Sequence, residues 1–209
     1  MGDFPAQSVD ALFSLASLEA AKTRDLPGDG PFYAGLDVAG PGKSETVLCV
    51  RQGPRIVLIK AWNIPDPSGH IMAALLPYRG NLARLNVDTV GMGYHLGQHF
   101  RRERLPVQEV NVGQTARENK VYANRKAELY CNLQMRFKTG NISGLTDERT
   151  ISQLAGILFS YTTGGLMAIE SKADALKRGV KSPDRAEAVM LAFAEQYAYP
   201  RIRLFTDDY

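Results

Sequence analysis

Residues 32–62, FYAGLDVAGPGKSETVLCVRQGPRIVLIKAW, contain three apolar segments that are separated by turns rich in glycine and proline. The segments cover residues 32–39, 46–52 and 55–62, and each has the length and composition of a β-strand. Short connections between neighbouring strands are typical of antiparallel pairing. The stretch therefore predicts an antiparallel meander within a sheet.

Beyond residue 62 the sequence alternates between helical and strand patterns. Helices are predicted at residues 68–78, 94–104, 124–139, 146–160 and 182–197, and strands at residues 84–90, 106–112 and 166–170. The last helix has a marked start, with Ser182 as N-cap, Pro183 at the first helical position and Asp184 in the first turn. A hairpin followed by alternating helices and strands predicts an α/β fold with a mixed sheet and helices packed on it.

The N-terminal region is set apart from this α/β pattern. Helical spacing of apolar residues predicts a helix over residues 8–23 with Ser8 as N-cap, and DLPGDGP at residues 25–31 predicts a loop. We expect an N-terminal helix and linker over residues 1–30, the main domain over residues 31–200 and a C-terminal tail over residues 201–209.

The composition is that of an ordinary folded protein. The 209 residues are 44% hydrophobic and 22% charged, which argues against wholesale disorder, a collagen-like chain or a coiled coil. No apolar run approaches the ~18 residues that a membrane-spanning helix needs, and residues 1–7 lack the pattern of a secretory signal. We expect a cytosolic location.

Two aspartates stand where predicted strands end. Asp37 lies in GLDVAGPG and Asp88 in VDTVGMG, each just before glycines. A buried carboxylate without a partner is costly, so each requires a cation or the N–H groups of a turn, and the turn is the commoner arrangement. Two carboxylates 4 Å apart repel by ~4 kcal/mol at an effective dielectric constant near 20. A hard divalent cation, Mg²⁺ or Mn²⁺, removes that penalty.

A further acidic pair lies on the last predicted helix. Asp184 and Glu187 are three residues apart and share one helix face. Either has an alternative role: Asp184 complements the helix dipole, or Glu187 pairs with Lys181 or Arg185.

Basic residues flank these acids in two clusters. Residues 101–126 carry a net charge of +4 and residues 172–185 carry +3. The candidate DNA-binding residues are Arg101, Arg102, Arg104, Arg117, Lys120, Arg125, Lys177, Arg178 and Lys181. Carboxylates surrounded by cations are typical of a phosphodiesterase that acts on nucleic acid, although charge alone fits a solvated surface equally well.

Seven segments, in this order and spacing, resemble the nuclease domain of the large terminase subunit of tailed double-stranded DNA bacteriophages. They are GDFPAQSVDALFS (2–14), GLDVAGPGKSETVLCV (35–50), VDTVGMGYHLGQHF (87–100), PVQEVNVG (106–113), NRKAELYCNL (124–133), IESK (169–172) and RGVKSPDRAEAVMLAFA (178–194). The resemblance implies an RNase H-like (RuvC-like) fold and a metal-dependent endonuclease that cleaves concatemeric viral DNA during genome packaging.

The resemblance also implies a site. Asp37 and Asp88 match the first two acids of a triad that holds two Mg²⁺ or Mn²⁺ ions, about 3.5–4 Å apart. The third acid falls in SPDRAEA, where the family commonly has aspartate at the position of Glu187; Asp184 is then an accessory ligand or a substitute. Ser44 stands where relatives often carry another aspartate. Lys172 matches a common lysine, which we assign as a catalytic residue that contacts phosphate or orients an acid.

The partners that the resemblance implies are double-stranded DNA, the ATPase domain of the same subunit, the small terminase subunit and the portal. It implies no membrane and a location in the host cell cytoplasm. Two alternatives stay open: another RNase H-like nuclease such as a junction resolvase, and a non-cleaving DNA-binding or docking module.

Overall fold

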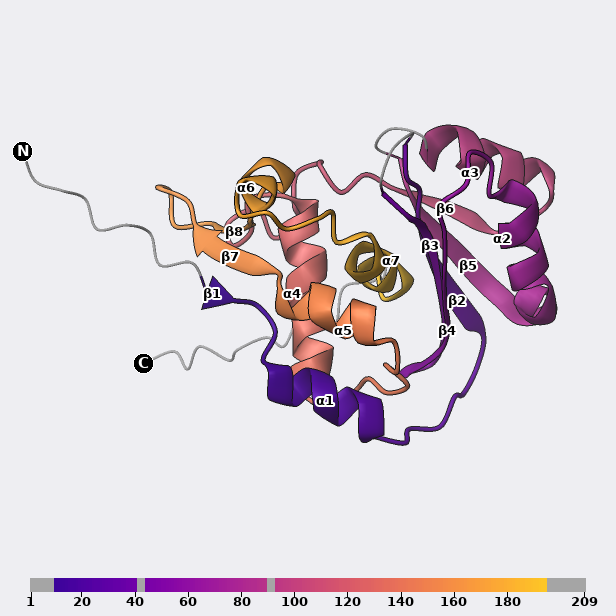
Figure 1. Cartoon of the computed structure of the whole chain (residues 1–209), viewed down its shortest axis with the longest axis horizontal. Coiled ribbons are helices and arrows are strands. Elements are labelled where there is room, and N and C mark those ends of the chain that lie inside the picture. Colours follow the sequence, from indigo (N-terminus) through magenta and orange to yellow (C-terminus); the bar gives the residue numbers. More distant parts are fainter. Residues whose placement is uncertain (1–9, 41–43, 90–92, 195–209) are drawn as a thin grey trace, which may run out of the picture.

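A computed structural model describes residues 10–40, 44–89 and 93–194 and contains a five-stranded main sheet (Figure 1). Its strands are β2 (Phe32–Asp37), β3 (Thr46–Gln52), β4 (Arg55–Trp62), β5 (Leu82–Asp88) and β6 (Val107–Val110), in the order β4-β3-β2-β5-β6. The pairs β2–β3 and β3–β4 are antiparallel, whereas β2–β5 and β5–β6 are parallel. The predicted meander and mixed sheet are confirmed.

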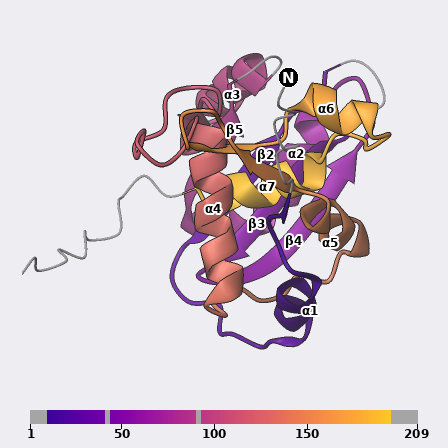
Figure 2. The same cartoon turned by 90° about the vertical axis from the view of Figure 1, so that its left-hand side faces the viewer.

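Helices cover both faces of this sheet (Figures 1 and 2). On one side lie α1 (Leu15–Thr23), α4 (Arg125–Lys138), α5 (Glu148–Ala155) and α7 (Asp184–Ala192), and on the other lie α2 (Ser68–Leu75) and α3 (Gly93–Arg102). Each side has its own apolar core. The helix α7 lies closest to the sheet, and α4 and α5 pack outside it (Figure 2).

The alternation of side chains along β2 and β3 divides the two cores. Val47 and Cys49 belong to the core beneath α7, whereas Leu48 and Val50 belong to the core beneath α2 and α3. Successive side chains of a strand point to opposite faces of the sheet. Both faces of β3 are therefore buried, which explains its continuous apolar run.

A second, three-stranded sheet was not predicted. It consists of β1 (Asp10–Ala11), β7 (Leu158–Tyr161) and β8 (Met167–Ile169), paired antiparallel in the order β1-β7-β8. The predicted helix over residues 146–160 is wrong in its second half, because α5 ends at Ala155 and Gly156 leads into β7. The helix α6 (Lys172–Lys177) was also missed, and Ser171 caps its start.

Other predicted boundaries shift by a few residues. The first helix begins at Leu15, with Ser14 as N-cap, because residues 10–11 pair with β7 instead; Ser8 lies outside the described residues. The predicted helix over residues 68–78 continues as a 3₁₀ helix, Leu76–Asn81. The last helix starts at Asp184 with Pro183, not Ser182, in the N-cap position. None of the helices in the described ranges is long and apolar enough to cross a membrane.

Candidate active site

The parallel pairing of β2 and β5 brings Asp37 and Asp88 to the same edge of the sheet. Leu36 pairs with Val87, and each aspartate is the next residue along its strand. Two residues earlier, Gly35 and Asn86 pair with each other and both contact α7. Because side chains alternate along a strand, Asp37 and Asp88 lie on the face that α7 covers.

The first turn of α7 supplies the other two acids. Asp184 and Glu187 are only 6% and 3% exposed. The Oδ2 atom of Asp184 accepts a hydrogen bond of 2.8 Å from the backbone N–H of Glu45, the residue before β3. The Nδ2 atom of Asn86 fixes the far end of α7 by donating to the carbonyl of Leu191 at 2.7 Å. The helix is thereby held along the sheet with its acids at the edge occupied by Asp37.

Asp37 is a strongly perturbed carboxylate. Burial raises its pKa well above the ordinary value, and the charges of Glu187, Asp184 and Asp88 raise it further. Lys172 opposes these effects without cancelling them. Because each of these charges acts on Asp37, the four acids form one electrostatic cluster. We call Asp37, Asp88, Asp184 and Glu187 the acid cluster.

Two lysines from different helices bind Glu187. Lys126 Nζ of α4 lies 2.5 Å from Oε1, and Lys172 Nζ of α6 lies 3.3 Å from Oε2. Burial acts to raise the pKa of Glu187, but the two ammonium groups outweigh it and hold that pKa below its usual value. Glu187 is therefore ionised, and the two lysines balance its charge. Burial and the neighbouring negative charges instead favour the protonated form of Asp37.

A buried tyrosine hydroxyl faces the same cluster. Tyr130, one turn after Lys126 on α4, is fully buried, and its hydroxyl has no hydrogen-bond partner among the described residues. Burial raises the pKa of Tyr130 well above its usual value, and the charges of Glu187, Asp37 and Asp184 add to the increase. The side chain therefore belongs to the core, and its polar end approaches the acids.

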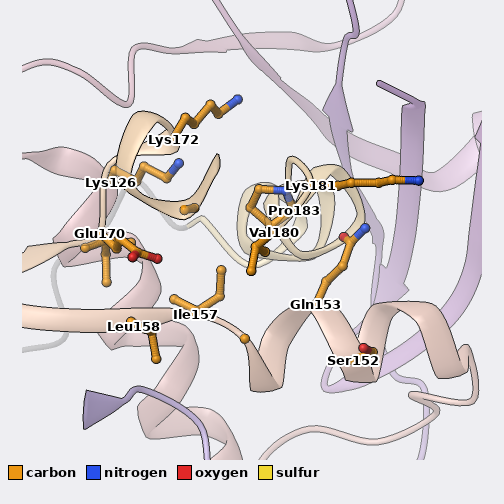
Figure 3. Close-up of a pocket in the computed structure, with 13 residues that line it drawn as sticks. Lys126, Ser152, Gln153, Ile157, Leu158, Glu170, Lys172, Val180, Lys181 and Pro183 are labelled. Atoms are coloured by element: carbon orange, nitrogen blue, oxygen red, sulfur yellow. The ribbon is translucent and has the colours of Figure 1, made fainter. Parts of the chain in front are cut away.

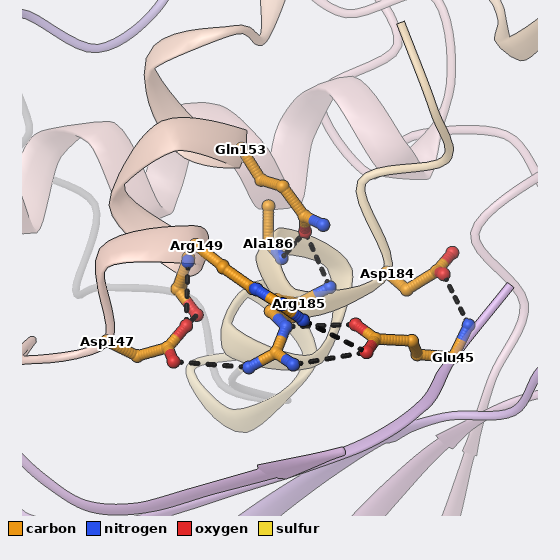
Figure 4. Close-up of polar contacts among 8 residues, drawn as sticks. Glu45, Asp147, Arg149, Gln153, Asp184, Arg185 and Ala186 are labelled. Carbon is orange, nitrogen blue, oxygen red and sulfur yellow. Dashed lines mark hydrogen bonds and ion pairs between the residues drawn. The ribbon is translucent and has the colours of Figure 1, made fainter. Parts of the chain in front are cut away.

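An ion-pair network fixes the strand that orients Asp184 (Figure 4). Arg185 donates to both carboxylate oxygens of Glu45, at 3.0 and 3.2 Å, and to Asp147 Oδ2 at 3.1 Å. The guanidinium of Arg149 lies 3.7 Å from Glu45 Oε1. Glu45 thus orients Asp184 through its backbone N–H while its own side chain is clamped.

The candidate DNA-binding residues differ in their burial and in their ion pairs. Arg125 is buried and pairs with Glu128 at 2.6 Å, so its prediction as a surface contact is not supported. Three other candidates form ion pairs: Arg101 with Glu109, Lys177 with Asp174, and Arg178 with Glu170. The remaining candidates, Arg102, Arg104, Arg117, Lys120 and Lys181, are exposed.

A mostly apolar cavity of about 220 Å³ is lined by residues of α5, β7, β8 and α6 (Figure 3). Ile157, Leu158 and Val180 contribute to its walls. Lys126 and Lys172, the two lysines that bind Glu187, also line it. The cavity thus adjoins the ion pairs of these lysines with Glu187.

Solved structures reveal what the arrangement resembles. The nuclease domain of the large terminase subunit gp2 of bacterial virus Sf6 superposes with a TM-score of 0.80 at 15% identity, over 90% of this chain and 100% of that one. The large terminase nuclease of thermophilic phage G20c gives 0.65 at 17% identity, over 90% and 99%. The HK97 large terminase gives 0.65 at 12% identity, over 90% of this chain and 44% of that longer one.

The chain has the fold of a phage large-terminase nuclease domain. The predicted RNase H-like α/β fold is thereby confirmed. No family model and no curated protein matches the sequence, so the likeness rests on the structure. Among the terminase nucleases, a mutant Sf6 domain has been solved with manganese and the G20c nuclease with magnesium.

Sequence reasoning missed two groups of this candidate site. Lys126 entered only through the net charge of residues 101–126, and Tyr130 was not assigned to the site. Their spacing of four residues on one predicted helix is the signal that links them, because such residues share a helix face. Glu45 and Arg185 were likewise not assigned any role in orienting the acids, since the pair joins residues 140 positions apart.

Proposed function

We propose that this chain is a metal-dependent DNA endonuclease that cuts viral DNA during genome packaging. The observation that carries the proposal is the convergence of four carboxylates, from β2, β5 and α7, at one edge of an RNase H-like sheet. Placing these acids close to Asp37 does not stabilise the fold, because each negative charge makes it harder for the others to ionise.

The donor chemistry of the acid cluster fits Mg²⁺ or Mn²⁺. All four candidate ligands offer hard carboxylate oxygens, which these ions prefer. Within the described residues no group of three His, Cys, Asp or Glu side chains is already arranged to hold a metal ion. The ammonium groups of Lys126 and Lys172 supply the positive charge beside the Glu187 carboxylate. Metal binding therefore requires side chains to move, with an ion replacing at least part of the lysine contact.

Two such ions, held by Asp37, Asp88 and Glu187 with Asp184 as accessory, would activate water and stabilise charge on the scissile phosphate. Three residues around the acid cluster contribute to that task. Glu45 orients Asp184 through its N–H, and Lys126 keeps Glu187 ionised and in place. Lys172, whose side chain is 61% exposed, reaches both Glu187 and solvent. It is therefore the cation that we assign to the phosphate.

The substrate that we propose is double-stranded DNA, in the cytoplasm of an infected host cell. The ATPase domain of the same large subunit is the proposed partner, with the small subunit and the portal as further members of the assembly. The HK97 large terminase is a longer chain, of which a region similar to this one forms 44%.

Nicking of a supercoiled plasmid tests the proposal. The protein is expected to convert the plasmid to open-circular and linear forms with Mn²⁺ or Mg²⁺, and not with EDTA. A non-cleaving docking module would bind DNA without nicking it under any metal. A junction resolvase would cut a four-way junction far faster than a linear duplex of the same length, so the two substrates are compared in one assay.

A further inference from the structure

A groove of about 770 Å³ is lined by residues of α5, α6 and the segment that leads into α7. Asp184 of the acid cluster is part of its lining, and Asn63 contributes from just after β4. Arg149, Lys172 and Lys181 supply three cations to the same lining. We call this feature the α5–α6 groove.

The acids of the α5–α6 groove are already engaged, whereas its cations reach into solvent. Glu45 is bound by Arg185, and Asp184 accepts the N–H of Glu45. The side chain of Arg149 is 76% exposed, and its 3.7 Å separation from Glu45 is longer than a hydrogen bond. Lys181 is exposed and extends away from Lys126 and Lys172 (Figure 3). The exposed charge of the groove is therefore positive.

We propose that the α5–α6 groove holds the phosphodiester backbone of DNA as it enters the acid cluster, with Arg149 and Lys181 as phosphate contacts. The inference rests on the proposed nuclease function and adds the path of the substrate to it. A guanidinium fork suits two phosphate oxygens. The hydroxyls of Ser44 and Ser182, also in the lining, are neutral donors of the kind that contact DNA backbones.

The position of the groove separates it from the other basic surface. The helix α3 packs against the core on the opposite side of the sheet from α7. Arg101 of α3 is engaged by Glu109 at 2.7 Å. A backbone that lies in the α5–α6 groove reaches Asp184 directly, whereas one that lies along α3 must pass over the sheet edge. We therefore place the DNA on the α5–α6 side. This path adds Arg149, which was not among the candidates from the sequence, as a phosphate contact.

The salt dependence of DNA binding tests this path. A fluorescein-labelled 20-base-pair duplex is titrated in EDTA, by anisotropy, over a series of NaCl concentrations. Each phosphate contact contributes about 0.9 to the slope of log K against log salt. Arg149→Gln and Lys181→Gln are each expected to reduce the slope by about one and to weaken binding several-fold at low salt. Arg149→Lys keeps the charge and is expected to retain the slope.

Two further variants complete the comparison. Lys138→Gln removes the same charge from the far end of α4, twelve residues and therefore ~18 Å from Lys126, and is expected to leave the slope unchanged. Arg102→Gln tests α3. The proposal is overturned if the two groove variants keep the wild-type slope, if Arg102→Gln alone reduces it, or if Lys138→Gln reduces it equally. Thermal melting of each variant confirms that these exposed substitutions leave the fold intact.

The outcome is independent of the proposed activity. If the wild-type protein nicks plasmid with Mn²⁺ while the groove variants bind as the wild type does, only the path is wrong. If the wild-type protein never nicks DNA, the nuclease function is wrong, and the slopes still decide where the backbone binds.

Discussion

Gly35 lies directly against the backbone of Ala192. A Cβ atom at Gly35 would come within 2.1 Å of the Ala192 nitrogen and 2.3 Å of the Ala188 carbonyl oxygen. The helix α7 therefore packs on β2 with no side chain between them. This contact sets the depth of α7, and with it the distance of Asp184 and Glu187 from Asp37, two residues further along β2.

Gly35→Ala is expected to destabilise the protein by about 3 kcal/mol or more, because the added methyl meets backbone atoms that cannot rotate away. Gly69→Ala is a matched control, since a Cβ there meets nothing within 4 Å and the residue lies in α2. The free energy of unfolding of Gly69→Ala should equal that of the wild type or exceed it by up to about 1 kcal/mol. Urea denaturation measures both, and equal stability of the two variants would contradict the direct contact.

Asp37→Asn is expected to abolish cleavage and leave DNA binding nearly unchanged, because it removes a metal ligand and no cation. The nicking assay with Mn²⁺ and anisotropy in EDTA measure the two effects separately. The buried position of Asp37 also predicts that the neutral variant folds at least as stably as the wild type near pH 7, since the ionised carboxylate is disfavoured there. A parallel loss of binding and cutting would place Asp37 in DNA contact instead.

The choice between Asp184 and Glu187 as third ligand is decided by comparing their variants. Among the charges that act on Asp37, Glu187 raises its pKa most and Asp184 less. We therefore expect Glu187→Gln to weaken Mn²⁺ binding by more than ten-fold and to abolish nicking, and Asp184→Asn to have smaller effects. Calorimetric titration with Mn²⁺ measures the binding. Full activity of Glu187→Gln would reverse the assignment.

A control is needed because Glu187→Gln also leaves Lys126 without its carboxylate in a buried site, which is destabilising. Glu187→Asp retains the charge with a shorter reach. If it melts like the wild type and retains Mn²⁺ binding, the loss in the glutamine variant is due to the missing ligand. If Glu187→Asp also fails to bind Mn²⁺ although it is folded, the longer side chain is required.

The two strand aspartates were predictable because their position follows from local rules. An apolar strand that ends in aspartate and glycine is visible in the sequence, and parallel neighbours end at one edge of a sheet. The start of α7 was visible to within one residue for the same reason, since proline followed by aspartate is typical of a helix start. These features need only residues that are close in sequence.

The lysine contacts were not predictable in this way. Arg125 and Lys126 are neighbours in one basic cluster, yet a helix turns about 100° from one residue to the next. Arg125 consequently pairs with Glu128 of its own helix, whereas Lys126 reaches Glu187, 61 residues away. Counting charges gives both residues the same weight. Only the packing of α4 against α7 determines which one meets the acids.

Asp147 provides a pH-dependent test of the network that holds Glu45. Burial acts to raise the pKa of Asp147, but hydrogen bonds from Thr150 and the charge of Arg185 outweigh it and hold that pKa below its usual value of 3.8. A carboxylate whose pKa is lower in the folded state stabilises the protein above its unfolded pKa and ceases to do so as the pH falls through the folded one. The contribution of Asp147 should therefore be present at pH 7 and disappear below about pH 4.

Asp147→Asn isolates this charge, because asparagine still offers an oxygen to cap α5. The variant is expected to be less stable than the wild type by about 1 kcal/mol at pH 7, a value reduced by solvent screening because Asp147 is part-exposed. The difference should narrow as the pH falls below about 4. Urea denaturation at pH 7, 5 and 3.5 measures it. A difference that stays constant with pH would mean that the charge of Asp147 is not its source. No difference at any pH would mean that Asp147 acts through its cap alone and that Arg185 clamps Glu45 without its help.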